Sequence, residues 1–92
     1  MIYSWLKNKI PHCTLLKKRM NEDIMIVCAS TLVIYYLNET AAYFVNSVDD
    51  KSTIEEIKKK FMESYNVSED EIEHDFVEMI RDLKWKKILT LE

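Results

Sequence analysis

The pattern of apolar and polar residues changes its period near residue 38, which divides the chain into two halves. Before this point, short runs rich in leucine, isoleucine and valine occupy residues 13–20, 23–29 and 32–37. Runs of this length, separated by the turn-favouring "NED" and by "AST", predict three adjacent antiparallel strands. Side chains of the third run alternate between two faces, and both faces are apolar.

After residue 38 the apolar positions recur at spacings of three and four, which predicts three helices. Asn38 is a suitable N-cap for the first helix. Thr53 with Glu56, and Ser68 with Glu71, are spaced as capping boxes for the second and third. The apolar faces comprise Ala41, Ala42, Phe44, Val45 and Val48; Ile54, Ile57, Phe61, Met62 and Tyr65; and Ile72, Phe76, Met79, Ile80 and Leu83. The order predicts an α+β domain in which a three-stranded antiparallel sheet is followed by three helices.

Residues 1–12 precede this pattern as an N-terminal extension, and the domain is expected to span residues 13–92. The apolar residues at helical spacing in the extension are Ile2, Trp5, Leu6 and Ile10. They predict a short amphipathic helix that ends before Pro11. The extension packs on the domain, mediates a dimer or docks on a partner enzyme, and the pattern leaves these alternatives open. Near the other end of the chain, we expect Trp85 to cap the core or to pack on the N-terminal segment, and core packing is favoured, because aromatic side chains are usually buried.

Composition limits the chemistry that the chain can perform. A chain of 92 residues with 48% apolar and 32% charged residues forms one domain with a single core. Glycine is absent, which excludes a P-loop, a dinucleotide fingerprint and a nucleophile elbow, because each needs glycine where the backbone turns tightly. His12 and His74 are not spaced as a metal pair, and no nucleophile, base and orienting group occur together. We expect no enzymatic activity, no cofactor and no metal site.

The cysteines and the longest apolar run indicate where the protein resides. Cys13 and Cys28 are too few for a disulfide framework and are expected to be reduced. The longest apolar run, residues 31–37, is far shorter than the roughly 20 residues of a membrane helix. The N-terminus lacks the continuous apolar segment of a signal peptide. We therefore expect a cytoplasmic protein without a membrane partner.

The third strand has no evident protection for an exposed edge. Residues 31–37 contain no proline, lysine, aspartate or glutamate, which usually prevent strands of other chains from pairing there. The strand is either covered by the rest of the fold or accepts an extended peptide as an added strand. The pattern alone leaves both alternatives open.

The order of motifs resembles the PqqD-like family, peptide-binding domains also called RiPP recognition elements, over residues 14–89. The matching motifs are "LNETAA" at the strand-to-helix joint, "STIEEI" at the second helix, "YNVSEDEI" before the third and "HDFVEMIRDL" within it. The resemblance implies a winged helix-turn-helix-like fold and a non-catalytic role. It also implies that the leader of a ribosomally made precursor peptide binds as an added strand. Lys87 departs from the family, which usually has glycine at the end of the third helix.

Carried over by position, the resemblance implies a groove between the third strand and the third helix. Its residues are Leu32, Val33, Ile34, Tyr35 and Tyr36 on the strand and Asp75, Phe76, Met79, Ile80 and Leu83 on the helix. Strand backbone groups supply affinity, apolar side chains supply selectivity, and Asp75 is placed to receive a backbone or basic group. The implied partners are the leader peptide and a modifying enzyme of the radical-SAM class. The chain is a monomer or a homodimer.

A winged-helix fold also suits a DNA-binding regulator, whose recognition helix enters the major groove. The acidic residues of the third helix argue against this alternative: Glu69, Asp70, Glu71, Glu73, Asp75, Glu78 and Asp82 accompany Arg81 alone between residues 68 and 83. With a net charge of −3, such a surface repels phosphates. The basic runs at residues 17–19 and 58–60 are expected to be solvated. Peptide presentation is favoured, with delivery to a leader protease or another tailoring enzyme as the alternative within the family.

Overall fold

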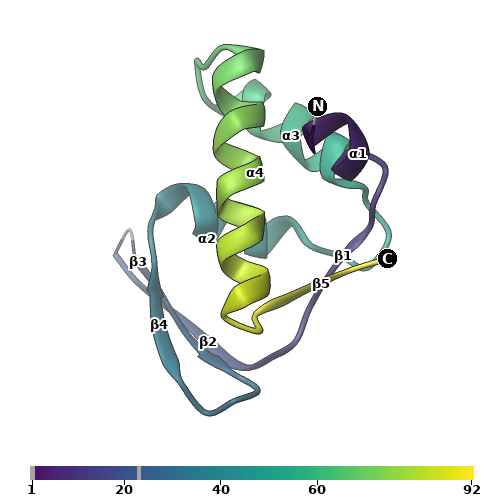
Figure 1. Cartoon of the computed structure of the whole chain (residues 1–92). Helices are drawn as coiled ribbons and strands as arrows, with labels where there is room; N and C mark the ends of the chain where they lie inside the picture. The colour runs from purple at the N-terminus through teal and green to yellow at the C-terminus, as the bar shows by residue number, and fades with distance from the viewer. Residues whose placement is uncertain (1, 23) are drawn as a thin grey trace.

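A computed structural model describes residues 2–22 and 24–92 and shows an α+β fold (Figure 1). The elements are α1 (Ile2–Leu6), β1 (Pro11–Cys13), β2 (Leu15–Asn21), β3 (Ile24–Ala29), β4 (Ile34–Leu37), α2 (Glu39–Ser47), α3 (Ile54–Ser64), α4 (Glu69–Trp85) and β5 (Leu89–Leu91). Strands β2, β3 and β4 form an antiparallel three-stranded sheet, followed by α2, α3 and α4, which confirms the predicted fold class. This order is compatible with a winged helix-turn-helix, which stays a prediction.

A three-residue turn joins β3 to β4 and shortens the predicted third strand. Ala29 N–H donates to Val33 O at 2.9 Å, and Leu32 N–H donates to Ala29 O at 2.9 Å. Leu32 takes a φ of 70°, the left-handed conformation that such loops require at this position. The strand therefore begins at Ile34, and the expectation that it begins at residue 32 was wrong.

The three predicted helix starts are confirmed, because each depends on a local side-chain cap. Asn38 Oδ1 accepts from Ala41 N–H at 3.0 Å directly after β4. Thr53 and Glu56 form the full capping box at the start of α3, with bonds of 3.2 and 2.9 Å. Ser68 Oγ accepts from Glu71 N–H at 3.2 Å at the start of α4. The cap at Asn38 allows the chain to pass from β4 to α2 without an intervening loop.

Helix α4 ends in a Schellman motif that has a lysine where glycine is usual. Ile88 N–H donates to Leu83 O at 3.0 Å, and Lys87 N–H donates to Lys84 O at 3.1 Å. Lys87 has a φ of 62°, so it adopts the left-handed conformation despite its side chain. Trp85 is 83% exposed, and the prediction that it packs in the core was wrong.

The chain after α4 returns to pair with the N-terminal segment. Strand β5 pairs antiparallel with β1, in the register Pro11↔Leu91, His12↔Thr90 and Cys13↔Leu89. Sequence pattern did not predict this ladder, because its strands are short and far apart in the chain. β1 crosses the expected boundary between residues 12 and 13, and that division stays a prediction.

The core lies between the inner face of the sheet and the three longer helices. Phe76 of α4 is fully buried, and its ring lies 5.3 Å from Phe44 of α2 and 6.0 Å from Phe61 of α3. From the sheet, Met25 and Val27 join this cluster. Alternation along β3 buries these side chains, because successive residues face opposite sides of a strand.

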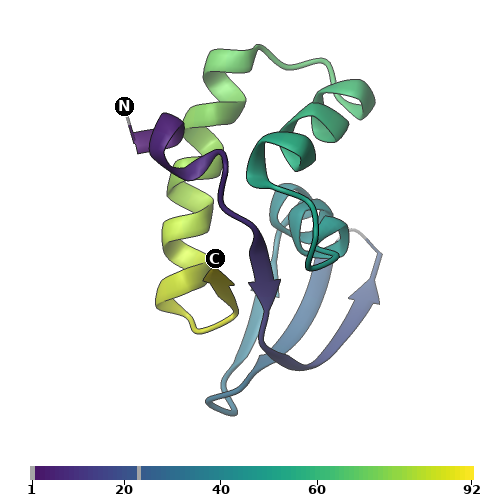
Figure 2. The same cartoon turned by 90° about the vertical axis from the view of Figure 1, so that its right-hand side faces the viewer.

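The N-terminal helix is present, but it buries a different face from the predicted one. Helix α1 lies against α4 (Figure 2). Tyr3 and Leu6 are buried, whereas Ile2 and Trp5 are 54% and 70% exposed. The extension therefore contains a helix, but it ends at Leu6 rather than just before Pro11, and Ile2 and Trp5 of its expected apolar face are exposed.

Lys58 holds α1, α3 and α4 together from a buried position. Its side chain is 1% exposed, and Nζ lies 2.8 Å from Glu73, 2.9 Å from Glu69 and 3.0 Å from Glu55. Nζ also lies 5.0 Å from the centre of the Tyr3 ring, and the Tyr3 hydroxyl donates to Glu55 at 2.7 Å. Burial disfavours the charge, but the three carboxylates outweigh it and raise the pKa of Lys58. The expectation of a solvated face was wrong for this lysine.

Candidate functional site

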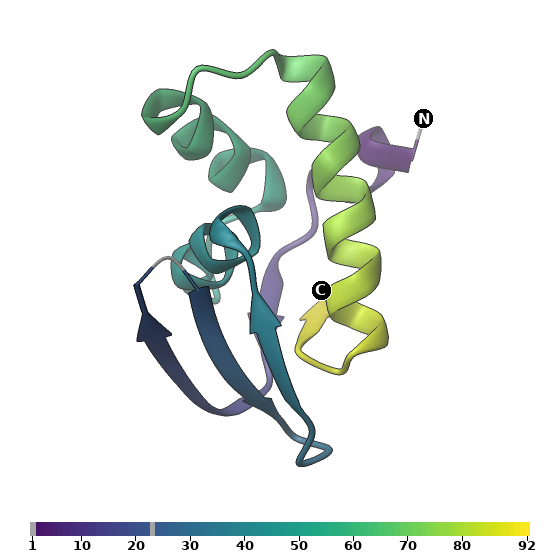
Figure 3. The ribbon, with the colours of Figure 1, turned by 90° about the vertical axis from the view of Figure 1, so that its left-hand side faces the viewer.

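Strand β4 lies at one edge of the sheet and is the strand nearest α4 (Figure 3). Within residues 2–22 and 24–92, only β3 pairs with it. The edge away from β3 is therefore a row of backbone groups without a strand partner, next to the longest helix. Such an edge is a template for an added strand.

The register identifies which backbone groups lie on this edge. The Ala29–Val33 bond marks a hydrogen-bonded pair, and hydrogen-bonded and non-hydrogen-bonded pairs alternate in an antiparallel ladder. Cys28 opposite Ile34 is then a non-hydrogen-bonded pair, and so is the pair that contains Tyr36. Ile34 and Tyr36 therefore direct N–H and C=O away from β3, toward the edge that an added strand would use.

Side chains of β4 alternate between the two faces of the sheet. Leu37 is buried and Tyr35 is half-buried, on the face that packs against the helices. Ile34 and Tyr36 are 60% and 69% exposed on the other face. A strand added to β4 would continue this alternation, with every second side chain directed to the helical side.

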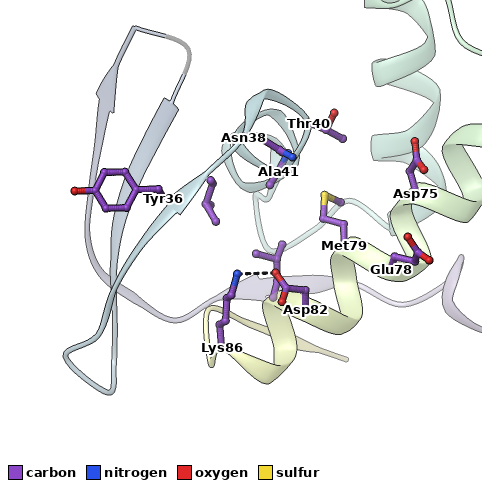
Figure 4. Close-up of a pocket in the computed structure, with 11 residues that line it drawn as sticks. Tyr36, Asn38, Thr40, Ala41, Asp75, Glu78, Met79, Asp82 and Lys86 are labelled. Carbon is purple, nitrogen blue, oxygen red and sulfur yellow. Dashed lines mark hydrogen bonds and ion pairs between the residues drawn. The ribbon is translucent and has the colours of Figure 1, made fainter.

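A groove of about 550 Å³ separates the end of β4 and the start of α2 from α4 (Figure 4). Its lining residues are Tyr36, Leu37, Asn38, Thr40, Ala41, Asp75, Glu78, Met79, Asp82, Leu83 and Lys86. Met79 is half-buried and supplies apolar surface, whereas Ala41 and Leu83 line the groove but are buried; Met79 is directed toward α2 in the close-up. Asp75, Glu78 and Asp82 are exposed and give the α4 side of the groove a negative charge.

Lys86 links α4 to β4 at one end of the groove. Its Nζ lies 2.8 Å from Asp82 Oδ2 and 5.1 Å from the centre of the Tyr35 ring. The ion pair balances the charge of Asp82 locally, whereas Glu78 and Asp75 lie one and two turns nearer the N-terminus of the helix. The negative charge of the groove is therefore concentrated away from Lys86.

The structure brings together only part of the predicted site. Tyr36, Asp75, Met79 and Leu83 line the groove. Phe76 and Ile80 are 0% and 1% exposed and belong to the core behind it. The other predicted residues on the strand side do not line the groove. Leu32 and Val33 come before the strand, Ile34 lies on the outer face, and Tyr35 lies behind Lys86.

Helical spacing explains three of the groove residues that were not predicted from the sequence. Glu78, Asp82 and Lys86 lie three, seven and eleven residues after Asp75, so they share its face of α4. Asn38, Thr40 and Ala41 come from the first turn of α2, which the cap holds beside the end of β4. The first set was accessible from the spacing alone, whereas the second depends on how α2 packs.

Searches of the described residues for a metal-binding cluster and for a membrane-spanning helix find neither. No group of three histidine, cysteine, aspartate or glutamate side chains in residues 2–22 and 24–92 is arranged to hold a metal ion. In the same part of the chain, every helix is too short or too polar to span a membrane.

Comparison with protein families gives one match, whose description is coenzyme PQQ synthesis protein D (PqqD), over residues 26–89. Comparisons with curated proteins and with solved structures give no match. The matched residues cover more than half of the chain and include β4, α2 and α4, the elements that form the groove. The chain therefore belongs to the PqqD family, whose members are non-catalytic proteins that bind a precursor peptide and act with its maturase.

Proposed function

We propose that this protein binds the leader of a ribosomally made precursor peptide as a strand added to β4, and presents the peptide's core segment to a separate radical-SAM enzyme. The free edge of β4 beside the groove is the observation that carries the proposal. Membership of the PqqD family supports a precursor peptide as the ligand and a maturase as the partner.

Backbone bonds supply the sequence-independent part of the affinity. Ile34 and Tyr36 direct their N–H and C=O groups to the edge, so a peptide strand has four backbone partners there. One set of leader side chains then enters the groove over Met79 and Leu83. The other set lies beside the exposed side chains of Ile34 and Tyr36 on the outer face.

The groove favours an apolar leader residue accompanied by a basic one. Met79 is half-buried and offers the surface for an apolar anchor, with the buried Ala41 and Leu83 lining the same groove. Asp75 and Glu78 line the adjacent part of the groove and attract lysine or arginine, whereas a leader with carboxylates at this position is repelled. The contribution of these exposed carboxylates falls as salt concentration rises.

The protein assists a reaction without performing chemistry. A protein that holds the leader and also contacts the enzyme raises the local concentration of the core segment at the enzyme's active site. The cytoplasm, where the precursor is translated, is the compartment that we propose. A leader protease or another tailoring enzyme in place of the radical-SAM enzyme would use the same groove and differ only in the partner.

Binding of a synthetic leader, encoded by a precursor gene next to that of this protein, tests the proposal by calorimetry. Met79→Asp places a charge on the apolar surface of the groove and is expected to weaken binding at least about tenfold, which corresponds to about 1.4 kcal/mol. Met62→Asp, at a half-buried methionine of α3 outside the groove, is the matched control. Equal affinity of both variants and the unmodified protein would exclude the groove as the leader site.

The role of the partner enzyme is tested separately by following modification of the precursor. Addition of this protein is expected to raise the rate of modification by the radical-SAM enzyme encoded beside it, and the Met79→Asp variant is expected to lose this effect. A rate that does not change on addition of the protein, with leader binding intact, would remove the presentation role and retain the peptide site.

A further inference from the structure

Both tryptophans of the chain lie exposed on the same side of the molecule, away from the leader groove. Trp5 and Trp85 are 70% and 83% exposed, and the neighbouring Ile2 is 54% exposed. Figure 1 shows α1 on one side of α4 and β4 on the other. Large apolar side chains clustered on a surface in this way mark an interaction site, and tryptophan is enriched among the residues that dominate binding energy.

Two hollows run along this side of α4, beside α1. The first has a volume of about 630 Å³ and includes Asp70, Glu73 and Val77; the second, of about 410 Å³, includes Val77, Lys84 and Trp85. Ile2, Val77 and Arg81 line both. The hollows therefore form one continuous surface, which we call the α1–α4 face.

Charges on the α1–α4 face are arranged symmetrically about Val77. Glu73 and Arg81 each lie four residues from Val77, and Asp70 and Lys84 each lie seven residues from it. All five residues line the hollows, so they share one face of α4. Asp70 and Glu73 thus each have a basic residue at the same distance on the opposite side of Val77, whereas Glu78, which also lines the first hollow, has none.

We propose that the α1–α4 face is a homodimer interface in which two copies place their α4 helices antiparallel around a twofold axis at Val77. In this arrangement Arg81 of one copy meets Glu73 of the other, and Lys84 meets Asp70. A twofold interface requires a patch that is complementary to itself, and this charge order meets the requirement. An arrangement with parallel helices would place like charges together instead.

The apolar residues of the face give this dimer its buried surface. Ile2, Trp5 and Trp85 flank the charged stripe and become covered when two copies meet. Glu73 already bonds Lys58 at 2.8 Å, which fixes its position. The dimer leaves the β4 groove of each copy open, because Asp75 and Met79 lie on the other side of α4.

Sedimentation of the unmodified protein over a range of concentrations up to millimolar tests the proposal. We expect a reversible monomer–dimer equilibrium, with tryptophan emission shifting to shorter wavelength in step with dimer formation. Both tryptophans belong to the proposed interface, so the emission reports on this face directly.

Charge exchange distinguishes the proposed pairing from a general effect on folding. Asp70→Lys and Lys84→Asp each place like charges together in a homodimer and are each expected to reduce dimerisation at least tenfold. An equimolar mixture restores opposite charges at both contacts and is expected to form the heterodimer. Asp75→Lys changes an exposed acid on the groove side of the same helix and is expected to leave self-association unchanged.

Three results would overturn the proposal: an unmodified protein that stays monomeric at all concentrations, variants that dimerise normally, or a mixture that fails to restore the dimer. A monomeric protein whose tryptophan emission shifts only when the modifying enzyme is added would also overturn it and would assign the face to that enzyme. These outcomes are independent of leader binding.

Discussion

Replacing Ile34 by proline tests which backbone groups of β4 meet the peptide. Proline has no N–H, and its ring occupies the space that an approaching strand needs. The register directs the N–H of Ile34 to the free edge, so the change removes a bond to the leader and none to β3. Tyr35→Pro is the matched control, because the register directs the N–H of Tyr35 to Val27 on β3.

Ile34→Pro is expected to weaken leader binding with little loss of stability, whereas Tyr35→Pro is expected to destabilise the fold. Loss of one hydrogen bond costs about 0.5 to 1.5 kcal/mol, and the steric block by the ring brings the loss of leader affinity to about tenfold or more for Ile34→Pro. Edge strands tolerate proline where the N–H faces outward, so the free energy of unfolding should fall by less than about 1 kcal/mol. Tyr35→Pro breaks a bond within the sheet and is expected to cost about 3 kcal/mol.

Calorimetric titration with the leader and urea unfolding followed by circular dichroism measure the two quantities. An Ile34→Pro variant that is folded and binds the leader with unchanged affinity would refute the added-strand geometry. An Ile34→Pro variant as unstable as Tyr35→Pro would show that the register of the edge is assigned wrongly.

Three further predictions concern the residues that hold the fold together. Lys58→Met leaves three carboxylates without their shared cation and is expected to lower the free energy of unfolding by about 2 to 3 kcal/mol, which is less than for fully buried pairs because the carboxylates are partly exposed. Lys59 is exposed on the same helix, so Lys59→Met should change the free energy of unfolding by less than about 0.5 kcal/mol. Equal effects of the two substitutions would contradict the role of the buried lysine. Lys87→Gly removes the strain of a side chain on a residue in the left-handed conformation, and it is expected to raise the free energy of unfolding by about 0.5 to 1 kcal/mol in denaturant titrations. A loss of stability would contradict the helix end described above. The hydrogen bond to Asp50, opposed by desolvation and helped by Glu92, raises the pKa of His12 above 6.5. The contribution of protonated His12 to stability is therefore complete below pH 6.5 and is lost as pH rises through the raised pKa. Thermal unfolding at several pH values should show this loss in the protein with its natural sequence and not in His12→Gln.

Sequence alone predicted the features that depend on neighbouring residues. The cap at Asn38 and the capping box at Thr53 each act within four residues, so their patterns identified the starts of α2 and α3. The hairpin of β2 and β3 followed from apolar runs around a turn. The β1–β5 ladder was missed because its strands are three residues each and lie at opposite ends of the chain.

Side-chain environments that depend on distant segments were predicted less well. Lys58 is indistinguishable from its exposed neighbour Lys59 in the sequence, and its burial results from carboxylates on α3 and α4. Trp85 was expected in the core, but it comes two residues after the buried Leu83 on α4 and therefore lies on the opposite, exposed side of the helix.

Prediction of the groove was limited by the orientation of α4. The apolar stripe of a helix identifies its buried face but not which neighbour covers each side of the stripe. Phe76 and Ile80 were therefore assigned to the groove together with Met79, although the first two are core residues. Asp75 and Met79 share a side of the helix that faces β4, and only the packing of α4 against the sheet establishes this.

An NMR titration of backbone amides with the synthetic leader tests the central claim most directly. We expect shifts concentrated on β4 and on the groove side of α4, with the largest changes at the amides of Ile34 and Tyr36. Saturation of these shifts should follow the calorimetric affinity. Shifts confined to the α1–α4 face, or no shifts with a leader that the modifying enzyme accepts, would contradict the claim that β4 and its groove bind the peptide.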